Sequence, residues 1–136
     1  IQPYLRRIAD GERALIYLDG AFSHAVRKGP VITEPGVIDN DRVAHPDPVD
    51  HVPSREEFAT AERALAACPG SGGLLYARVD LALDDAGRPV VMELELVEPD
   101  LFCARSQAAL RNFAAAVERW LPGRRTGPAA ADAVRA

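Results

Sequence analysis

Two apolar segments that each fold back at a glycine-containing turn constrain the fold of this chain more than any other feature. In the first, the run Ala14–Leu18 ends at Asp19-Gly20, a dipeptide typical of tight hairpin turns, and a second run returns from Phe22. In the other, two apolar runs flank Asp84-Asp85-Ala86-Gly87. Because short turns connect antiparallel neighbours, these patterns predict two β-hairpins, over residues 12–28 and 74–97.

Two stretches with helical periodicity accompany the hairpins. Ser54 and Glu57 fit a capping box at the start of one helix. The apolar face predicted for this helix comprises Phe58, Ala61, Leu65 and Cys68, and Pro69-Gly70 ends it. The second helix is predicted by Leu110, Phe113, Ala114, Val117, Trp120 and Leu121, before Pro122-Gly123. The order of elements predicts an α+β fold, with an antiparallel β-sheet backed by helices.

The remaining segments lack a periodic pattern. Residues 29–53 are rich in proline and predict a long surface loop, a feature that is often functional when it exceeds about 15 residues. Residues 124–136 are rich in alanine, glycine, proline and arginine, and they predict a flexible tail. We therefore expect one subdomain over residues 1–123. The chain opens with Ile1 rather than methionine, so we expect either a preceding segment or a trimmed chain.

The composition excludes several classes of protein. A formal net charge of −4 and a pI near 5.3 argue against a nucleic-acid-binding domain, which usually carries a basic face. No apolar run approaches the roughly 20 residues that a membrane-spanning helix needs. Cys68 and Cys103 have no neighbouring cysteine or histidine pair, so a zinc site is not predicted. The two cysteines fit a cytoplasmic protein with reduced thiols, although a disulfide stays open.

The second hairpin carries the strongest functional signal. Arg78 and Asp80 are two residues apart and so share one face of their strand, as do Glu93 and Glu95 on the next. A turn of two or four residues would bring both pairs to the same face, whereas three or five would separate them. Clustered carboxylates need a cation, and oxygen ligands suit Mg²⁺. The simpler interpretation is a solvated polar face on which Arg78 pairs with Glu93.

This hairpin resembles the metal-binding hairpin of the ATP-grasp superfamily. The resemblance is carried by the run Ala77–Leu81 and by Gly87–Glu95, which follow that family's pattern of Arg-x-Asp, a short turn and Glu-x-Asn. Glu95 stands where the family usually has asparagine, and residues 97–100 differ from its usual substrate loop. The resemblance implies a carboxyl-terminal ATP-grasp half that binds magnesium through Asp80, Glu93 and Glu95, with Mn²⁺ as an alternative ion.

The amino-terminal residues resemble the hinge of the same family and the strand after it. By this resemblance, the hinge that holds Gln2 and Tyr4 would bind the adenine of ATP, and Met92 would pack against the adenine ring. Glu12 would hold the ribose hydroxyls, and either Arg27 or Lys28 would approach phosphate. The resemblance also gives Arg13 and Arg78 a catalytic role, in which both stabilise the acyl phosphate or the tetrahedral intermediate.

The resemblance implies a cytoplasmic carboxylate–amine ligase that acts through an acyl phosphate on small-molecule substrates. The amino-terminal ATP-grasp half, with its phosphate-binding lysine, is missing from the chain and would have to complete it. The family includes homodimers, so a homodimer stays open. One alternative is a catalytically silent half-domain or split-protein partner that binds nucleotide only when completed. Another is a metal-dependent hydrolase that uses the same carboxylates.

The histidines invite separate hypotheses. His24 lies mid-strand, where a packed or solvated imidazole is expected, with a proton shuttle as the alternative. His45 and His51 accompany Asp41, Asp47 and Asp50 in the proline-rich loop. Their spacing has no helical or turn-fixed pattern that would favour a metal site. The resemblance implies that this loop region lies near the active site, so substrate contact is the preferred hypothesis.

Overall fold

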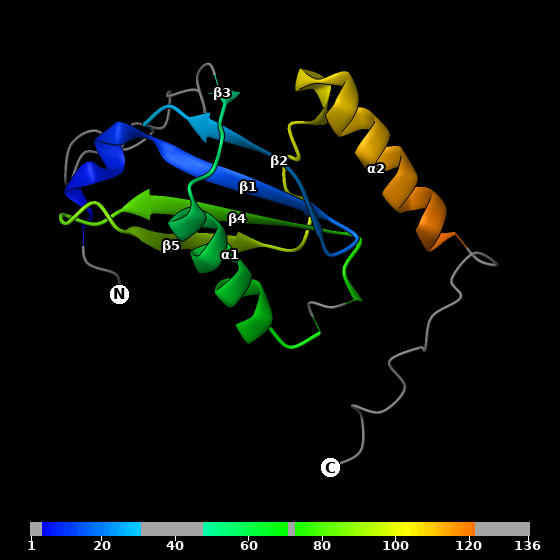
Figure 1. Cartoon of the computed structure of the whole chain (residues 1–136), viewed down its shortest axis with the longest axis horizontal. Helices are drawn as coiled ribbons and strands as arrows, with labels where there is room; N and C mark the ends of the chain where they lie inside the picture. The colour runs from blue at the N-terminus through cyan, green and yellow to red at the C-terminus, as the bar shows by residue number, and fades with distance from the viewer. Residues whose placement is uncertain (1–3, 31–47, 71–72, 122–136) are drawn as a thin grey trace, which may run out of the picture.

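The chain forms one five-stranded antiparallel sheet flanked by two helices. The computed structural model describes residues 4–30, 48–70 and 73–121, and the strand order is β3-β2-β1-β4-β5 (Figure 1). The strands are β1 Glu12–Leu18, β2 Ala21–Lys28, β3 Val49–Asp50, β4 Tyr76–Leu83 and β5 Pro89–Glu95, and the helices are α1 Arg55–Ala67 and α2 Gln107–Trp120. Short 3-10 turns cover Arg6–Asp10 and Cys103–Arg105. The predicted α+β fold class is therefore confirmed.

Both predicted hairpins are present. The first closes at Asp19 and Gly20, whose φ angles of 51° and 78° are both positive, as the mirror-image turns of two-residue hairpins require. The register of this hairpin shifts by one residue between Ile16 and Tyr17, which leaves Ser23 without a partner on β1. This β-bulge determines which basic residue at the end of β2 faces the centre of the sheet.

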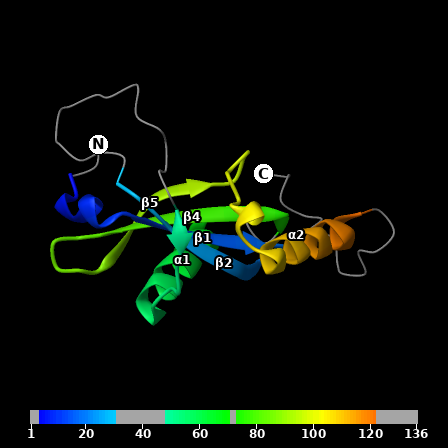
Figure 2. The ribbon, with the colours of Figure 1, turned by 90° about the horizontal axis from the view of Figure 1, so that it is seen from above.

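Helix α1 begins as predicted, and Phe58, Ala61 and Leu65 of its predicted apolar face pack on the sheet, whereas Cys68 follows the helix as its C-cap residue. The Ser54 Oγ atom accepts a hydrogen bond from the Glu57 amide at 3.2 Å, and Glu57 Oε2 accepts one from the Ser54 amide at 2.7 Å. Figure 1 shows α1 over β4 and β5, and Figure 2 shows it projecting from one side of the sheet. The core beneath it contains Leu15, Tyr17, Ala25, Ala61, Ala77, Val79 and Leu81.

Helix α2 packs on the second core, but through a different stripe of residues than predicted. The buried positions of α2 are Ala109 and Ala116, and Phe113 packs against the same core. Leu110, predicted to face inward, is 43% exposed. The row of residues through Ala109, Phe113 and Ala116 also has the 3–4 spacing of one helix face. Its small alanines let the helix approach the sheet closely. The core of this face contains Ala14, Ile16, Leu18, Val26, Phe102 and Ala116.

The predicted long loop contains a short strand that its composition did not indicate. Val49 and Asp50 form β3, which pairs with Arg27 and Val26 of β2 at the edge of the sheet. Residues 31–47, the predicted tail over 124–136 and the hinge residue Gln2 lie outside the described residues. The subdomain boundary at residue 123 stays a prediction for the same reason. In the described part of the chain, neither helix has the length and apolar character needed to cross a bilayer.

Candidate metal and nucleotide site

A bulge in the second hairpin brings the predicted acidic residues together. The turn between β4 and β5 closes with the Asp84 amide donating to the Arg88 carbonyl at 2.9 Å, which leaves a turn of three residues. Such a turn alone would separate the charged pairs. The register shifts between Asp80 and Leu81, however, and Met92 becomes the extra residue of a β-bulge. As a result, Asp80 lies opposite Glu93, and Arg78 lies opposite Glu95.

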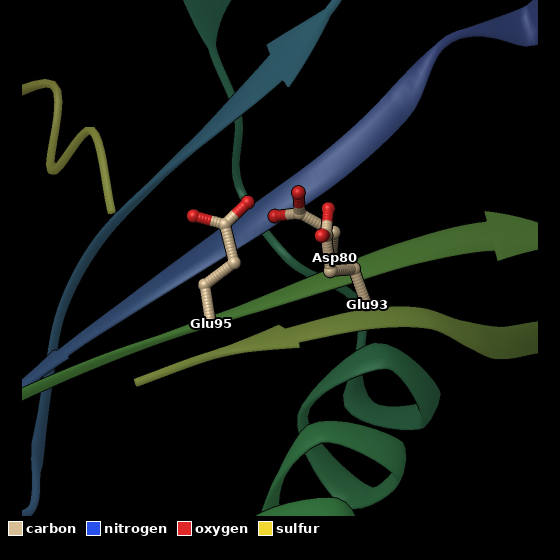
Figure 3. A group of neighbouring side chains, drawn as sticks. All are labelled: Asp80, Glu93 and Glu95. Atoms are coloured by element: carbon tan, nitrogen blue, oxygen red, sulfur yellow. The ribbon is translucent and has the colours of Figure 1, made fainter. Parts of the chain in front are cut away.

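Asp80, Glu93 and Glu95 form what we call the carboxylate cluster. One carboxylate oxygen from each residue lies within 4.8 Å of the other two, and Figure 3 shows the three groups on the same side of β4 and β5. Asp80 is fully buried at the base of the cluster, Glu95 is partly buried and Glu93 is exposed. The cluster therefore has a rigid buried floor and an open rim.

Arg78 binds two members of the cluster. Its Nε atom donates to Asp80 Oδ1 at 2.9 Å, and its Nη2 atom donates to Asp80 Oδ2 at 2.9 Å and also to Glu95 Oε1. Its Nη1 atom donates to the Asp100 carbonyl at 3.0 Å, and its guanidinium lies 5.8 Å from the centre of the Phe102 ring. The guanidinium is thus held on several sides, and its orientation is fixed before any ligand binds.

Lys28 is the second cation of the site. Its Nζ atom lies 2.5 Å from Asp80 Oδ2 and 2.9 Å from Glu12 Oε2, and the residue is 1% exposed. The bulge in the first hairpin is responsible, because it pairs Glu12 with Lys28 and places Arg27 opposite Arg13. The sequence left open which of the two basic residues approaches the site. The structure brings Lys28 to the carboxylate cluster and leaves Arg27 exposed.

The charges of the site perturb its pKa values. Burial raises the pKa of Glu95 and the charges of Glu93 and Asp80 raise it further, while Arg78 opposes the shift. Burial acts to lower the pKa of Arg78, but the hydrogen bonds and charge of Asp80, together with Glu95 and Glu93, outweigh it and raise that pKa. Carboxylates that raise one another's pKa values, as Glu93 and Asp80 do for Glu95, are typical of a site that binds a cation.

The residues present fit a hard divalent cation. Glu12 and the carboxylate cluster supply four carboxylates, and Lys28 and Arg78 supply two cations; we call these six residues the charge network. The network carries a formal charge of −2, which one divalent ion would neutralise. All three donors of the carboxylate cluster are oxygen ligands, which suit Mg²⁺ or Mn²⁺ better than a thiolate-binding metal.

Arg13 does not lie with this network, and its placement corrects a sequence-based prediction. Alternate residues of a strand face opposite sides, and Ala14, not Arg13, pairs with Asp80. Arg13 lies on the α1 side, where its Nη1 atom donates to the Gly11 carbonyl at 2.6 Å and its Nε atom lies 3.4 Å from Glu57 Oε1. The resemblance gave Arg13 and Arg78 a shared role at the acyl phosphate or the tetrahedral intermediate, but the two side chains lie on opposite faces of the sheet.

Sequence reasoning missed the ion pairs of Glu57. This residue was predicted only as a capping residue, yet its Oε2 atom also lies 3.0 Å from His51 Nε2, and its Oε1 atom lies near Arg13. We call Arg13, His51 and Glu57 the α1-side triad. The alternation of β1, which places Arg13 with Leu15 above α1, was the available signal. Asp50, another residue of the predicted loop, lies 3.4 Å from Arg105 Nε instead.

The other candidate residues have simpler surroundings. The ring nitrogens of His24 lie 2.9 Å from Ser23 Oγ and 2.8 Å from the Leu101 carbonyl oxygen, so its imidazole is a packed group, as predicted. Met92 is partly buried on β5, next to Glu93 in the sequence. Tyr4 is 46% exposed ahead of β1, which leaves its predicted contact with adenine untested.

Comparison with known proteins identifies the relatives of this fold. The chain is 35% identical over 132 residues to the cycloserine biosynthesis protein DcsG of Streptomyces lavendulae, a match that covers 90% of this chain. The crystal structure of the D-cycloserine synthetase DcsG superposes with a TM-score of 0.70 at 32% identity over 88% of this chain. These matches support a relationship of this chain to an ATP-grasp-related family. The chain resembles the carboxyl-terminal half of that fold, as the hairpin motif predicted.

The chain covers less than half the length of each of these relatives. The chain spans 42% of the length of its DcsG relative. The D-alanine–D-alanine ligase of Bacillus anthracis, solved with ATP, has a TM-score of 0.48 at 18% identity over 79% of this chain and 35% of its own, and adds nothing to the assignment. No family model matches the sequence.

Proposed function

We propose that this chain supplies the metal-binding side of an ATP- and magnesium-dependent carboxylate–amine ligase. The observation that carries the proposal is the convergence of Asp80, Glu93 and Glu95 within 4.8 Å, in a network whose formal charge matches one divalent ion. The relationship to DcsG, a synthetase, supports ligase chemistry for the protein that contains this chain.

Each member of the network has a distinct role in this proposal. Asp80, Glu93 and Glu95 would hold Mg²⁺, which when bound supplies positive charge for the phosphate oxygens of ATP. Glu12 would accept hydrogen bonds from the ribose hydroxyls. Around these, Gln2 and Tyr4 would line the adenine site with Met92, and Lys28 would meet a phosphate.

Arg78 is the proposed catalytic residue of this chain. Its guanidinium is held by the bidentate contact with Asp80 and by the Asp100 carbonyl, so it needs no reorganisation when negative charge develops nearby. In the proposed reaction, the substrate carboxylate displaces ADP from the γ-phosphorus to give an acyl phosphate. An amine then attacks the acyl carbon, phosphate leaves, and the amine nitrogen loses a proton. Arg78 stabilises the charge on the acyl phosphate, without a contribution from Arg13.

Metal titration with matched variants tests the proposal. We expect Mg²⁺ to raise the midpoint of thermal unfolding of the chain, and Mn²⁺ to bind with a saturable electron-paramagnetic signal. Glu93→Gln and Glu95→Gln should each weaken the metal by about tenfold or more, because each removes a charged oxygen ligand. Asp85→Asn, in the exposed turn of the same hairpin, should leave affinity unchanged. Equal affinity in all variants would overturn the assignment.

A second candidate function follows from the share of its relatives that the chain covers. Because it spans 42% of the DcsG relative, it is a candidate half-domain that is silent alone and binds nucleotide only when completed. Calorimetry with Mg²⁺ alone and with Mg²⁺–ATP separates the two. Under this alternative, metal binds the isolated chain but ATP adds no further heat until the complementary amino-terminal segment is present.

A further inference from the structure

Lys28 occupies lone pairs that a metal ion at Asp80 would need. Asp80 Oδ2 accepts from Lys28 Nζ at 2.5 Å and from Arg78 Nη2 at 2.9 Å, while Oδ1 accepts from Arg78 Nε at 2.9 Å. A carboxylate oxygen has two acceptor sites, so both sites on Oδ2 are taken and one remains on Oδ1. A cation that uses Oδ2 must therefore displace one of these two donors.

The surroundings of the two donors indicate which one yields. Arg78 is anchored by both Asp80 oxygens, by Glu95 and by the Asp100 carbonyl, so its displacement would break several bonds at once. Lys28 gives up a single contact and keeps Glu12, 2.9 Å from its Nζ atom. Its ammonium is also a compact point charge on a flexible stem, unlike the planar fork of arginine.

We propose that Lys28 is the resident counter-ion of Asp80 and that a divalent cation replaces it there, leaving the ammonium on Glu12. This inference rests on the proposed function, because it assumes that the carboxylate cluster takes a divalent ion. It adds a positioning role for Lys28: the lysine satisfies the buried Asp80 when the metal is absent and sets the affinity for the metal. It also links the Glu12 end of the site to the metal end through one side chain.

The composition of the chain makes the exchange directly observable. Lys28 is the only lysine among the 136 residues, and the other fifteen of the sixteen lysine and arginine residues are arginines. A protein grown with ¹⁵N-lysine therefore has a single side-chain ammonium resonance. We expect this resonance to be protected from water exchange without metal, since Lys28 is 1% exposed. We expect it to shift in a saturable way during a Mg²⁺ titration, with a dissociation constant that also accounts for the rise in thermal stability. An unmoved resonance at saturating Mg²⁺ would overturn the proposal.

A charge-matched pair of variants gives an independent test. Lys28→Met removes the competing ammonium, and Arg27→Met removes an equal charge from the adjacent exposed residue on the opposite side of the strand. In Lys28→Met, we expect Mn²⁺ affinity to rise by about tenfold, because the metal no longer has to displace the Lys28 ammonium from Asp80. In Arg27→Met, we expect a rise of less than about threefold, because this change alters only the long-range electrostatic potential at the site. Equal changes in the two variants, or weaker binding by Lys28→Met, would contradict direct competition.

Failure of the proposed function has a different signature. If the unmodified chain shows no saturable Mg²⁺ or Mn²⁺ binding, the metal assignment itself is wrong. If it binds metal while the Lys28 resonance stays unmoved, only the counter-ion exchange is wrong. The resonance is measured on the unmodified chain, so it decides the question even where Lys28→Met does not fold without metal.

Discussion

The two faces of the sheet each bury a group of charges, but only one group is out of balance. On the α2 side, the charge network has four carboxylates and two cations, and its rim at Glu93 is open. On the α1 side, Glu57 meets Arg13 and His51, and the capping box of α1 encloses it. The excess negative charge lies toward the open rim, where we propose that an external cation neutralises it, whereas the balanced group on the α1 side needs no ligand.

The balance of charges therefore separates a candidate site from a structural contact better than burial does. Arg13 and Glu57 are 8% and 6% exposed, close to the 3% and 0% of Arg78 and Asp80. Burial lowers the pKa of Arg13, with Glu57 opposing it. Both groups are ion-paired, but only the charge network has more carboxylates than cations, so that a ligand could still neutralise it. The following variants test this contrast.

The largest expected effect is that of Asp80→Asn. This change removes the negative charge that pairs with the buried Arg78 and Lys28. Removing one partner of a buried ion pair costs about 3–5 kcal/mol. We expect that loss in the free energy of urea unfolding, with no recovery on addition of Mg²⁺. Asp85→Asn serves as the exposed control. A loss below about 1 kcal/mol would mean that Asp80 does not anchor the network.

Glu57→Gln should have a smaller effect, of about 2 kcal/mol, because the amide keeps part of the cap but loses the charge facing Arg13 and His51. Burial acts to raise the pKa of Glu57, but the hydrogen bond from Ser54 and the contacts with His51 and Arg13 outweigh it and lower that pKa. The contribution of the ionised form is thus present above the ordinary value of 4.5 and is lost as the pH falls through the lower folded value.

Unfolding measured across pH checks this prediction. The difference between the unmodified chain and Glu57→Gln should be constant near neutrality and shrink below about pH 4.5, where the unfolded state begins to take up the proton. Glu56→Gln, at the neighbouring exposed position in the first turn of α1, controls for the helix dipole. Added Mg²⁺ should stabilise the unmodified chain and Glu57→Gln equally and so leave the difference between them unchanged, whereas Glu93→Gln should gain less from Mg²⁺. A difference between the unmodified chain and Glu57→Gln that changes with Mg²⁺ would break the distinction between the two faces.

The sequence predicted the elements of the site but not the registers that assemble it. Alternation placed Arg78 with Asp80, and Glu93 with Glu95, on shared strand faces. The family resemblance pointed to Asp80, Glu93 and Glu95 as metal ligands and to either Arg27 or Lys28 near phosphate. Two single-residue bulges then decided the outcome: one at Ser23 turns Lys28 inward, and one at Met92 offsets the three-residue turn. A bulge depends on packing of the whole sheet rather than on a local motif, so alternation alone could not place it.

Long-range contacts explain the remaining errors in the same way. Glu57 satisfies a local capping rule, and its partner Arg13 is distant in sequence, so only the fold reveals the ion pair. The stripe of α2 that packs is selected by the sheet beneath it and by the bond from Trp120 Nε1 to Asp19 Oδ1 at 3.0 Å. Helical periodicity predicts how wide an apolar face is. It does not predict which of two adjacent rows of apolar residues, one through Ala109 and one through Leu110, packs on the sheet.

Tyr17→Phe should have the smallest effect and tests whether the α1 side holds an unmet polar group. The Tyr17 Oη atom is buried and has no hydrogen-bond partner among the described residues, so its removal should change stability by no more than about 1 kcal/mol, in the stabilising direction. Burial, with a further contribution from Glu62, raises the pKa of Tyr17 to about 12. A folded pKa above the ordinary value of 10 means that the contribution to stability falls as the pH rises through that range.

Alkaline unfolding is the sharper measurement for Tyr17. The unmodified chain should lose up to about 1.4 kcal/mol per pH unit from this group between pH 10 and 12, a loss that Tyr17→Phe avoids. Tyr76→Phe, on the partly buried start of β4, is the matched control and should keep the alkaline loss. If Tyr17→Phe is instead destabilised by more than about 1 kcal/mol at neutral pH, the hydroxyl has a partner, and the α1 side contains a polar contact beyond its balanced triad.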